Sequence, residues 1–261
     1  MMLNHGVCNI SRTVCRRSVF RDHRENAGRC LSVKPPRYHA LAVDFDGTIA
    51  HDRVVDRPTR DALRRARAAG AKLLLITGRL RSSLQRDFDE PELFDLVVLE
   101  NGAVILDPAA DQEEPLSDPP PPEFAEELLR RGVPEQRLRV GRVIVSTWRP
   151  HELIVAEVIR DLGLDRQIIF NKDAVMTLPP GLDKEAGLRA ALDRLSVATS
   201  RAIGVGDAEN DEPLLAVCGL GVAVANATAA LKEQADLVTH GERGRGVAEV
   251  IDRFFTADHP I

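Results

Sequence analysis

The sequence predicts an α/β protein in which a Rossmann-like parallel sheet carries helices on both faces and is interrupted by an inserted α/β segment. Three observations predict this class. Short β-branched or leucine-rich runs alternate with helical patterns from residue 38 onward, as in βαβ units. The first runs are apolar throughout, which indicates strands that are buried on both faces. The same pattern resumes after a Pro-Pro-Gly break at 179–181, which indicates one core with an insertion.

The first elements of the core follow from their residue types. Residues 39–44 are an apolar run and predict the first strand. Residues 58–70 predict a helix, because Pro58 suits a first helical turn and Gly70 suits a helix end. Residues 72–77 predict the second buried strand.

The middle of the chain has a different character. Residues 95–107 predict two strands joined at Asn101-Gly102, a dipeptide that favours a tight turn. Residues 107–123 are rich in proline and acidic residues and predict an exposed loop or linker. A second α/β set follows it: helix 123–132, strand 142–148, helix 150–163 and strand 167–179.

After the Pro-Pro-Gly break the first pattern returns. Its predicted elements are helix 184–195, strand 201–207, helix 209–218, strand 220–225, helix 227–236, strand 237–240 and helix 246–255. We therefore expect a core domain of residues 38–84 and 181–261, an inserted α/β cap domain of residues 85–180, and a basic, disordered tail of residues 1–37.

Charge is distributed unevenly between the tail and the rest of the chain. The net charge is −5, and residues 1–37 hold eight Lys/Arg against two Asp/Glu. The remaining acidic body argues against nucleic acid as a partner, because phosphate backbones need a basic surface. No apolar run approaches the roughly 18 residues of a membrane span, so we expect no membrane partner. Oligomeric state stays open between monomer and homodimer.

Cysteine usage indicates a reducing compartment, and we expect a cytoplasmic protein. Three of the four cysteines (Cys8, Cys15 and Cys30) lie in the tail and lack zinc-finger spacing. The fourth, Cys218, predicts a buried free thiol. The tail is rich in arginine and poor in acidic residues, which leaves three interpretations: an organellar transit peptide, a disordered tail, or a start codon placed too far upstream.

Polar side chains gather where predicted strands end. Asp44 ends the first strand and Asp46 follows it, and Thr77 ends the second strand. Asp207 ends the strand 201–207, and Asn210 and Asp211 follow it. Ligands of open α/β sheets bind at the carboxyl ends of the strands. So many carboxylates would repel one another unless a cation lay between them, and Mg2+ prefers hard oxygen ligands. Thr77, Gly78 and Lys184 would then supply donors to an anion, which points to a phosphoryl group.

Four ordered motifs carry a resemblance to a known family: DFDGT at 44–48, TGR at 77–79, DKEAGL at 183–188 and GDAENDEPLL at 206–215. Together they resemble the haloacid dehalogenase-like (HAD) phosphohydrolases. ENGA at 100–103 is similar to the Cof-type branch, whose cap is inserted between the second and third motifs. The resemblance covers about residues 38–255. It departs from the commonest form at Ala208, where many relatives have glycine.

The resemblance implies a role for each matching residue. Asp44 matches the family's nucleophile, which forms an aspartyl-phosphate. Asp46 matches the family's acid/base residue, whose backbone carbonyl binds the metal. The remaining implied roles are phosphate binding for Thr77, Gly78, Lys184 and Asn210, and metal binding for Asp44, Asp46, Asp207 and Asp211. The cofactor implied is Mg2+.

Simpler interpretations stand beside several of these roles. Asp207 and Asp211 could cap the following helix, and Lys184 could be a solvated lysine. Arg79 could face solvent or bind a substrate anion, and Asn101 could form a turn or bind substrate. Four residues of the insertion could line a substrate pocket, although surface or packing roles are simpler for each: Trp148, Arg149, Asn171 and Lys172.

The sequence thus predicts a Mg2+-dependent phosphatase of a small phosphorylated metabolite, such as a sugar phosphate or phosphoglycolate, acting through an aspartyl-phosphate. An aromatic content of 4% offers few platforms for stacking a nucleobase. Two alternatives remain. A phosphotransferase or phosphomutase would use the same aspartyl-phosphate, and a catalytically inactive metal-binding regulatory module would keep only the fold.

Overall fold

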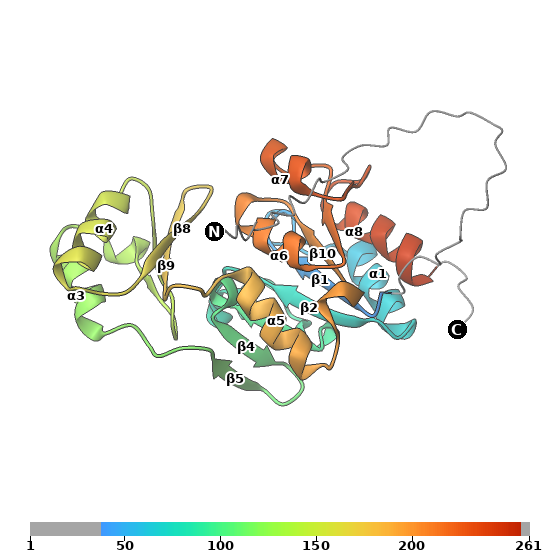
Figure 1. Ribbon diagram of the computed structural model, residues 1–261, viewed down its shortest axis with the longest axis horizontal. Coiled ribbons are helices and arrows are strands. Elements are labelled where there is room, and N and C mark those ends of the chain that lie inside the picture. The colour runs from blue at the N-terminus through green and yellow to red at the C-terminus, as the bar shows by residue number, and fades with distance from the viewer. Residues whose placement is uncertain (1–37, 257–261) are drawn as a thin grey trace, which may run out of the picture. The chain divides into compact units, whose positions relative to one another are not determined.

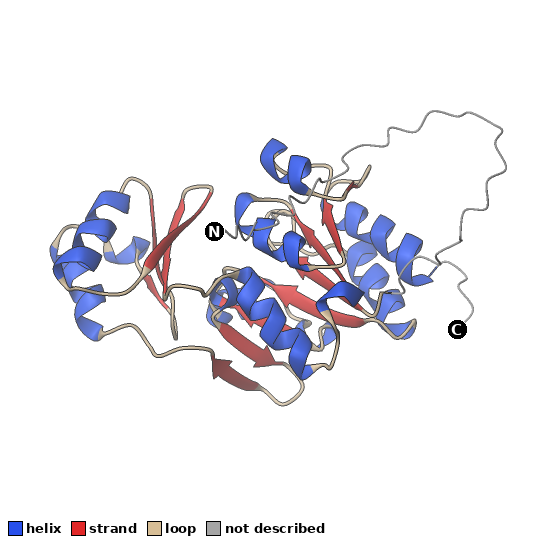
Figure 2. Ribbon diagram, in the orientation of Figure 1, coloured by secondary structure: helices blue, strands red, loops and turns tan. Residues whose placement is uncertain are grey.

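The computed structural model describes residues 38–256, and these residues form two β-sheets with helices packed against them. Predictions for the tail of residues 1–37 and its three cysteines lie outside the described residues. The predicted α/β class is confirmed, and Figure 2 shows the strands of the larger sheet lying between helices. No helix among residues 38–256 is both long enough and apolar enough to cross a bilayer.

The larger sheet has eight strands, and its order in space places the first strand of the chain near the middle. From one edge to the other the strands are β12 (Leu237–Val238), β11 (Leu220–Ala223), β10 (Ala202–Gly206), β1 (Ala40–Asp44), β2 (Lys72–Ile76), β3 (Leu96–Leu99), β4 (Val104–Asp107) and β5 (Gln112–Pro115). Neighbours from β12 to β3 pair in parallel, and β4 and β5 complete the sheet in antiparallel fashion.

Helices cover both faces of this sheet (Figure 1). They are α1 (Arg57–Ala68), α2 (Arg81–Asp87), α5 (Lys184–Arg194), α6 (Glu212–Val217), α7 (Ala229–Gln234) and α8 (Arg243–Ile251). Helix α1 packs against α8, and α5 packs against α6. The order of strands moves from β1 toward β3 in the first half of the chain and toward β12 in the second. Right-handed crossovers therefore place the two helix pairs on opposite faces.

The register of the central strands sets the position of the chemistry. Asp44 pairs with Ile76, and Val43 pairs with Val205. Thr77 and Asp207 therefore follow neighbouring strands at the same carboxyl-terminal edge as Asp44. The strand β1 that delivers Asp44 is fully buried apart from that residue, which is 5% exposed. Tight packing on both faces fixes the position of the carboxylate.

The second sheet belongs to the inserted part of the chain. Its strands are antiparallel in the order β6 (Arg139–Val140), β7 (Val145–Trp148), β9 (Ala174–Leu178) and β8 (Gln167–Asn171). Helices α3 (Pro122–Arg130) and α4 (Glu152–Asp161) accompany it. This unit has its own small apolar core, in which Phe124 and Leu128 pack with Val155, Val158 and Val175.

The structure divides the segment 85–180, which the sequence assigns wholly to the insertion. Strands β3, β4 and β5 lie in the larger sheet, so the part with its own sheet begins after Pro115 and not at residue 85. The physical reason is that β3 and β4 are apolar, buried strands and β3 pairs in parallel with β2. The predicted turn at Asn101-Gly102 does join them as an antiparallel pair.

The predicted loop at 107–123 also needs correction, because β5 lies within it. Residues Gln112–Pro115 pair with β4 although their side chains are polar and mostly exposed. An edge strand needs only backbone pairing on one side, and proline is tolerated there. Polar composition therefore conceals a strand at the edge of the sheet.

Candidate active site

The loop after β1 is closed tightly around a glycine. Gly47 adopts φ +90°, a left-handed conformation that favours glycine. A Cβ atom at this position would lie 2.2 Å from the Asp207 Oδ2 atom. The Gly47 carbonyl accepts a hydrogen bond from Asn226 Nδ2 at 2.8 Å, and Asn226 Oδ1 accepts one from the Arg243 backbone N–H at 2.7 Å. The loop that carries Asp44 is thus held from the start of α8 and lies directly against Asp207.

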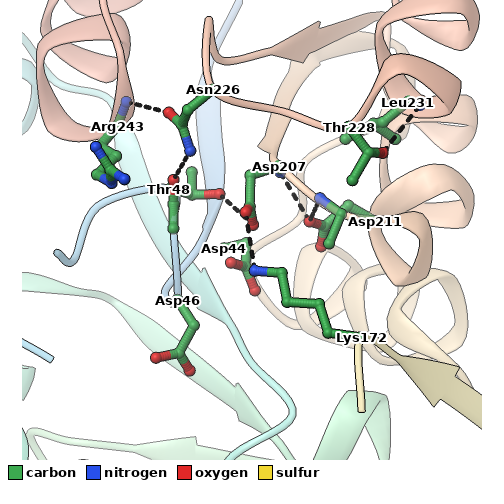
Figure 3. Close-up of polar contacts among 12 residues, drawn as sticks. Asp44, Asp46, Thr48, Lys172, Asp207, Asp211, Asn226, Thr228, Leu231 and Arg243 are labelled. Atoms are coloured by element: carbon green, nitrogen blue, oxygen red, sulfur yellow. Dashed lines mark hydrogen bonds and ion pairs between the residues drawn. The ribbon is translucent and has the colours of Figure 1, made fainter. Parts of the chain in front are cut away.

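Three buried carboxylates form a cluster at the edge of the sheet (Figure 3). Asp44, Asp207 and Asp211 each offer an oxygen, and these atoms lie within 4.8 Å of one another. Asp211 is oriented by its own turn, since its Oδ2 accepts hydrogen bonds from the backbone N–H groups of Asp207 (2.9 Å) and Ala208 (3.1 Å). The ends of the predicted strands 39–44 and 201–207 therefore meet in the structure, as expected.

The ammonium of Lys184 lies between two of these carboxylates. Lys184 opens α5 after the N-cap residue Asp183 and is 1% exposed. Its Nζ donates to Asp44 Oδ1 and to Asp211 Oδ1, each at 2.5 Å. Burial alone would lower the pKa of Lys184, but the two carboxylates outweigh burial and raise it, so the ammonium stays charged. A solvated role for Lys184 is excluded by its burial.

One ammonium cannot neutralise three carboxylates. Burial raises the pKa of Asp44 to about 8, and the nearby Asp211 adds to this rise, although Lys184 opposes it. Burial likewise raises the pKa of Asp207. When these groups are ionised, the three carboxylates outnumber the ammonium of Lys184 and that of Lys172, which contacts Asp207 from the second sheet, so negative charge remains uncompensated. A divalent cation would remove this imbalance.

The donor set fits a hard divalent cation. Mg2+ binds oxygen ligands at about 2.0–2.1 Å, so oxygens on either side of it lie roughly 4 Å apart. The spacing of up to 4.8 Å between oxygens of Asp44, Asp207 and Asp211 requires only small adjustments. The carboxylate of Asp46 is not a member of this cluster, and Figure 3 shows it pointing away from the other three.

Asp46 is instead held by Arg79. The guanidinium donates from Nε to Asp46 Oδ2 at 2.7 Å and from Nη2 to Asp46 Oδ1 at 2.6 Å, a two-pronged contact that fixes the carboxylate. Arg79 also pairs with Asp87 at 2.6 Å and stacks on the Phe45 ring at 4.7 Å. With its side chain 14% exposed, Arg79 does not face solvent. It positions Asp46, a role that the sequence interpretation did not include.

Asn101 contacts both the second motif, TGR, and the fourth motif, GDAENDEPLL. Thr77 is 1% exposed, and its Oγ1 accepts from the Arg79 backbone N–H at 3.2 Å. Asn101 donates its backbone N–H to the Thr77 carbonyl at 2.9 Å, and its Oδ1 accepts from Asn210 Nδ2 at 3.2 Å. Asn101 adopts φ +56° in the turn between β3 and β4 and is buried, so the turn-forming role is confirmed.

The amide of Asn210 offers a further indication of a ligand. Its Oδ1 is buried and lacks a hydrogen-bond partner among the described residues. A buried polar atom without a partner is costly in a native structure. A bound molecule with a donor group would satisfy it.

Comparison with known proteins agrees with these motifs. The family model for haloacid dehalogenase-like hydrolases matches residues 41–133 and 142–251. The chain belongs to this family. The predicted membership of the HAD-like hydrolases is therefore confirmed.

The chain covers nearly the full length of individual relatives. The chain is 31% identical over 221 residues to a phosphoglycolate phosphatase of Methanothermobacter thermautotrophicus, covering 82% of this chain and 98% of that protein. It is 32% identical over 228 residues to a phosphoglycolate phosphatase of Natronomonas pharaonis, covering 82% and 96%. Among solved structures, a haloacid dehalogenase-like hydrolase from Bacteroides thetaiotaomicron shares the fold with a TM-score of 0.70 at 19% identity, covering 84% and 100%.

Glu100 makes contacts that were not predicted from the sequence. It is 3% exposed, yet its carboxylate accepts three backbone N–H groups, from Arg142 (2.8 Å), Val143 (2.9 Å) and Ile144 (2.9 Å). These donors lie in the turn before β7, so Glu100 ties the second sheet to the turn that carries Asn101. Its signal in the sequence is an acidic residue directly after the buried strand β3.

Lys172 is the second residue whose contact the sequence did not predict. It lies in the turn between β8 and β9, and its Nζ donates to Asp207 Oδ2 at 3.2 Å. Figure 3 shows its side chain reaching the carboxylates of the core. Two of the other three insertion residues considered for a pocket have side-chain partners: Arg149 pairs with Glu152, and Trp148 lies under the Arg139 guanidinium. Asn171 pairs with Ala174 through its backbone, and its buried Oδ1 has no hydrogen-bond partner among the described residues.

Proposed function

We propose that this HAD-like phosphatase hydrolyses a small phosphorylated metabolite with Mg2+ and an aspartyl-phosphate on Asp44. The observation that carries the proposal is the cluster of Asp44, Asp207 and Asp211 with the ammonium of Lys184 inside it. Carboxylates alone would suit a structural cation. The buried ammonium and the Thr77–Gly78 strand end beside them suit an anion that shares the site with the cation.

In the first step Asp44 acts as nucleophile. One of its carboxylate oxygens forms a bond to phosphorus while the bond from phosphorus to the leaving oxygen breaks. Asp46 donates its proton to that oxygen, so that the alcohol leaves as a neutral molecule. Both oxygens of Asp46 accept from Arg79 in the structure. Before Asp46 donates, one oxygen must leave Arg79 and take up a proton, while the other oxygen stays on the guanidinium and keeps the side chain in position.

The second step regenerates the enzyme. Asp46, now ionised, takes a proton from a water molecule, whose oxygen forms a bond to phosphorus as the bond to Asp44 breaks. Inorganic phosphate leaves, and both aspartates return to their starting state. Lys184 holds Asp44 in place and balances charge on the phosphoryl oxygens throughout. Mg2+, held by Asp44, Asp207 and Asp211, would supply further positive charge to those oxygens.

The substrate proposed is a small phosphate monoester of the phosphoglycolate type, with a sugar phosphate as the other candidate of this class. The support for the first is that both sequence relatives above are named phosphoglycolate phosphatases. We further propose that residues 116–180 act as the cap over the site. Two contacts support this proposal: Lys172 donates to Asp207, and Glu100 accepts hydrogen bonds from the turn before β7.

The experiment is a panel of phosphorylated metabolites with release of inorganic phosphate as readout, run with EDTA and then with added Mg2+. We expect release from 2-phosphoglycolate that stops with EDTA and returns with Mg2+. Metal-independent release would contradict the site described. Transfer of labelled phosphate to an acceptor sugar, with little free phosphate, would favour a phosphotransferase.

A further inference from the structure

The turn between β8 and β9 has an unusual residue, Lys172, at its first position. Asn171 pairs with Ala174 across β8 and β9, which leaves Lys172 and Asp173 as a two-residue turn. Lys172 adopts φ +53°, a left-handed conformation that costs a non-glycine residue about 1–2 kcal/mol. Glycine and asparagine are the residues favoured in such turns. A lysine held there against its backbone preference points to a use for the side chain.

The environment of Lys172 differs from that of Lys184. Lys184 is 1% exposed and donates to two carboxylates, whereas the side chain of Lys172 is 57% exposed and pairs with one carboxylate, that of Asp207, among the described residues. The buried lysine already balances the charge next to the nucleophile. The ammonium of Lys172 remains open to a ligand that approaches from solvent. When a cation takes up the oxygens of Asp207, Lys172 loses its partner and can bind another anion.

We propose that Lys172 binds the carboxylate of the leaving group, so that the substrate is the phosphate monoester of a short hydroxy acid. This inference rests on the function proposed above and narrows its substrate. The geometry limits the length of such a ligand. Lys172 touches the Asp207 carboxylate, which in turn lies beside Asp44 (Figure 3). These contacts place the Lys172 ammonium near Asp44, so a short leaving group on a phosphorus held at Asp44 lies within its reach.

The test compares a leaving group that carries a carboxylate with one that does not. Wild type, Lys172→Met and Lys172→Arg are assayed with 2-phosphoglycolate and with p-nitrophenyl phosphate, which lacks the carboxylate. The readout is the ratio of the two kcat/KM values. We expect Lys172→Met to lower the preference for 2-phosphoglycolate about 10- to 100-fold, as for loss of a hydrogen bond between charged groups. Lys172→Arg keeps the charge and should recover part of the preference.

A matched control separates the role of Lys172 from a general loss of lysine charge. Lys72 is the first residue of β2, at the opposite end of the strand from Thr77. It is half-exposed and pairs with Asp95. Lys72→Met should leave the preference unchanged. A second readout does not depend on turnover: Mg2+ binding measured by calorimetry should be equal or tighter in Lys172→Met, because Lys172 no longer competes for Asp207.

Three results would overturn the inference, and they are distinguishable. If Lys172→Met lowers both kcat/KM values by the same factor, Lys172 acts on the phosphoryl group or on the fold. If wild type hydrolyses p-nitrophenyl phosphate and hexose phosphates but not 2-phosphoglycolate, the short acid is wrong while the phosphatase proposal stands. If wild type releases phosphate from none of them, the proposed function fails and this inference fails with it.

Discussion

Replacing Lys184 with methionine is the perturbation whose size the structure sets most clearly. The side chain is 1% exposed and its ammonium donates to Asp44 and Asp211 at 2.5 Å each. Removing one partner of a buried ion pair costs about 3–5 kcal/mol, because the remaining charge is buried without compensation. For a folded domain of this size, 1 kcal/mol corresponds to about 2–4 °C in Tm. Lys184→Met should therefore lower the Tm of the metal-free protein by about 6–20 °C.

The assay is thermal unfolding in EDTA and in excess Mg2+, with Lys72→Met as control. Lys72 also loses one ion pair, but at a side chain 47% exposed, where such pairs contribute at most about 1 kcal/mol. Mg2+ should raise the Tm of Lys184→Met more than that of wild type, since three carboxylates are left without an ammonium. A Tm for Lys184→Met no lower than that of Lys72→Met would refute this reasoning.

Four further outcomes are expected. Asp44→Asn should reduce turnover of p-nitrophenyl phosphate at least about 10⁴-fold with the fold intact by circular dichroism, because an amide cannot attack phosphorus; a rate near wild type would remove Asp44 as nucleophile. Arg79→Lys should lower kcat about 10²-fold with little change in KM, since a lysine cannot hold Asp46 by two prongs; an unchanged kcat would contradict its positioning role. Glu100→Ala should destabilise the protein by about 1–3 kcal/mol in urea unfolding, because three backbone N–H groups lose their acceptor; a neutral effect would mean that water replaces the carboxylate. The stability of the metal-free protein should fall as pH rises from about 4 to about 8, because folding raises the pKa of Asp44 to about 8 and the folded state then holds a proton that the unfolded chain releases; a Tm series in EDTA tests this, and Asp44→Asn should flatten the slope.

Much of the core fold could be predicted because its strands are buried on both faces. An unbroken apolar run such as 72–76 has few alternatives, and helix ends marked by Pro58 and Gly70 lie close to the observed bounds. The boundary of the insertion could not be predicted in the same way. Strands β3 and β4 have the composition of any buried strand, and only pairing with β2 assigns them to the larger sheet.

The edge strand β5 shows a different limit. Its sequence, Gln112–Pro115, is polar because one side of the strand faces solvent and the other needs only backbone bonds. Periodicity carries no signal for a strand of this kind. A pattern of acid and proline therefore predicts a loop whether or not a strand is present.

For the site, the sequence could predict which residue types gather but not how they pair. Strand ends at one edge of a parallel sheet must meet, so the proximity of Asp44 and Asp207 follows from topology. The pairing of Arg79 with Asp46, and of Lys172 with Asp207, depends on side-chain direction across elements distant in sequence. Glu100 accepts from backbone groups of the turn before β7, and although an acidic residue directly after a buried strand stands out in the sequence, the sequence does not show which groups it contacts.

The most direct test of the central claim is chemical capture of the phosphorylated enzyme. The protein is mixed with substrate and Mg2+, quenched within the first turnover and reduced with borohydride, which converts an aspartyl-phosphate to homoserine. Peptide mass spectrometry should find homoserine at residue 44 in wild type and none in Asp44→Asn. Turnover with no modification at residue 44, or with homoserine at another aspartate, would contradict the assignment of Asp44 as the nucleophile.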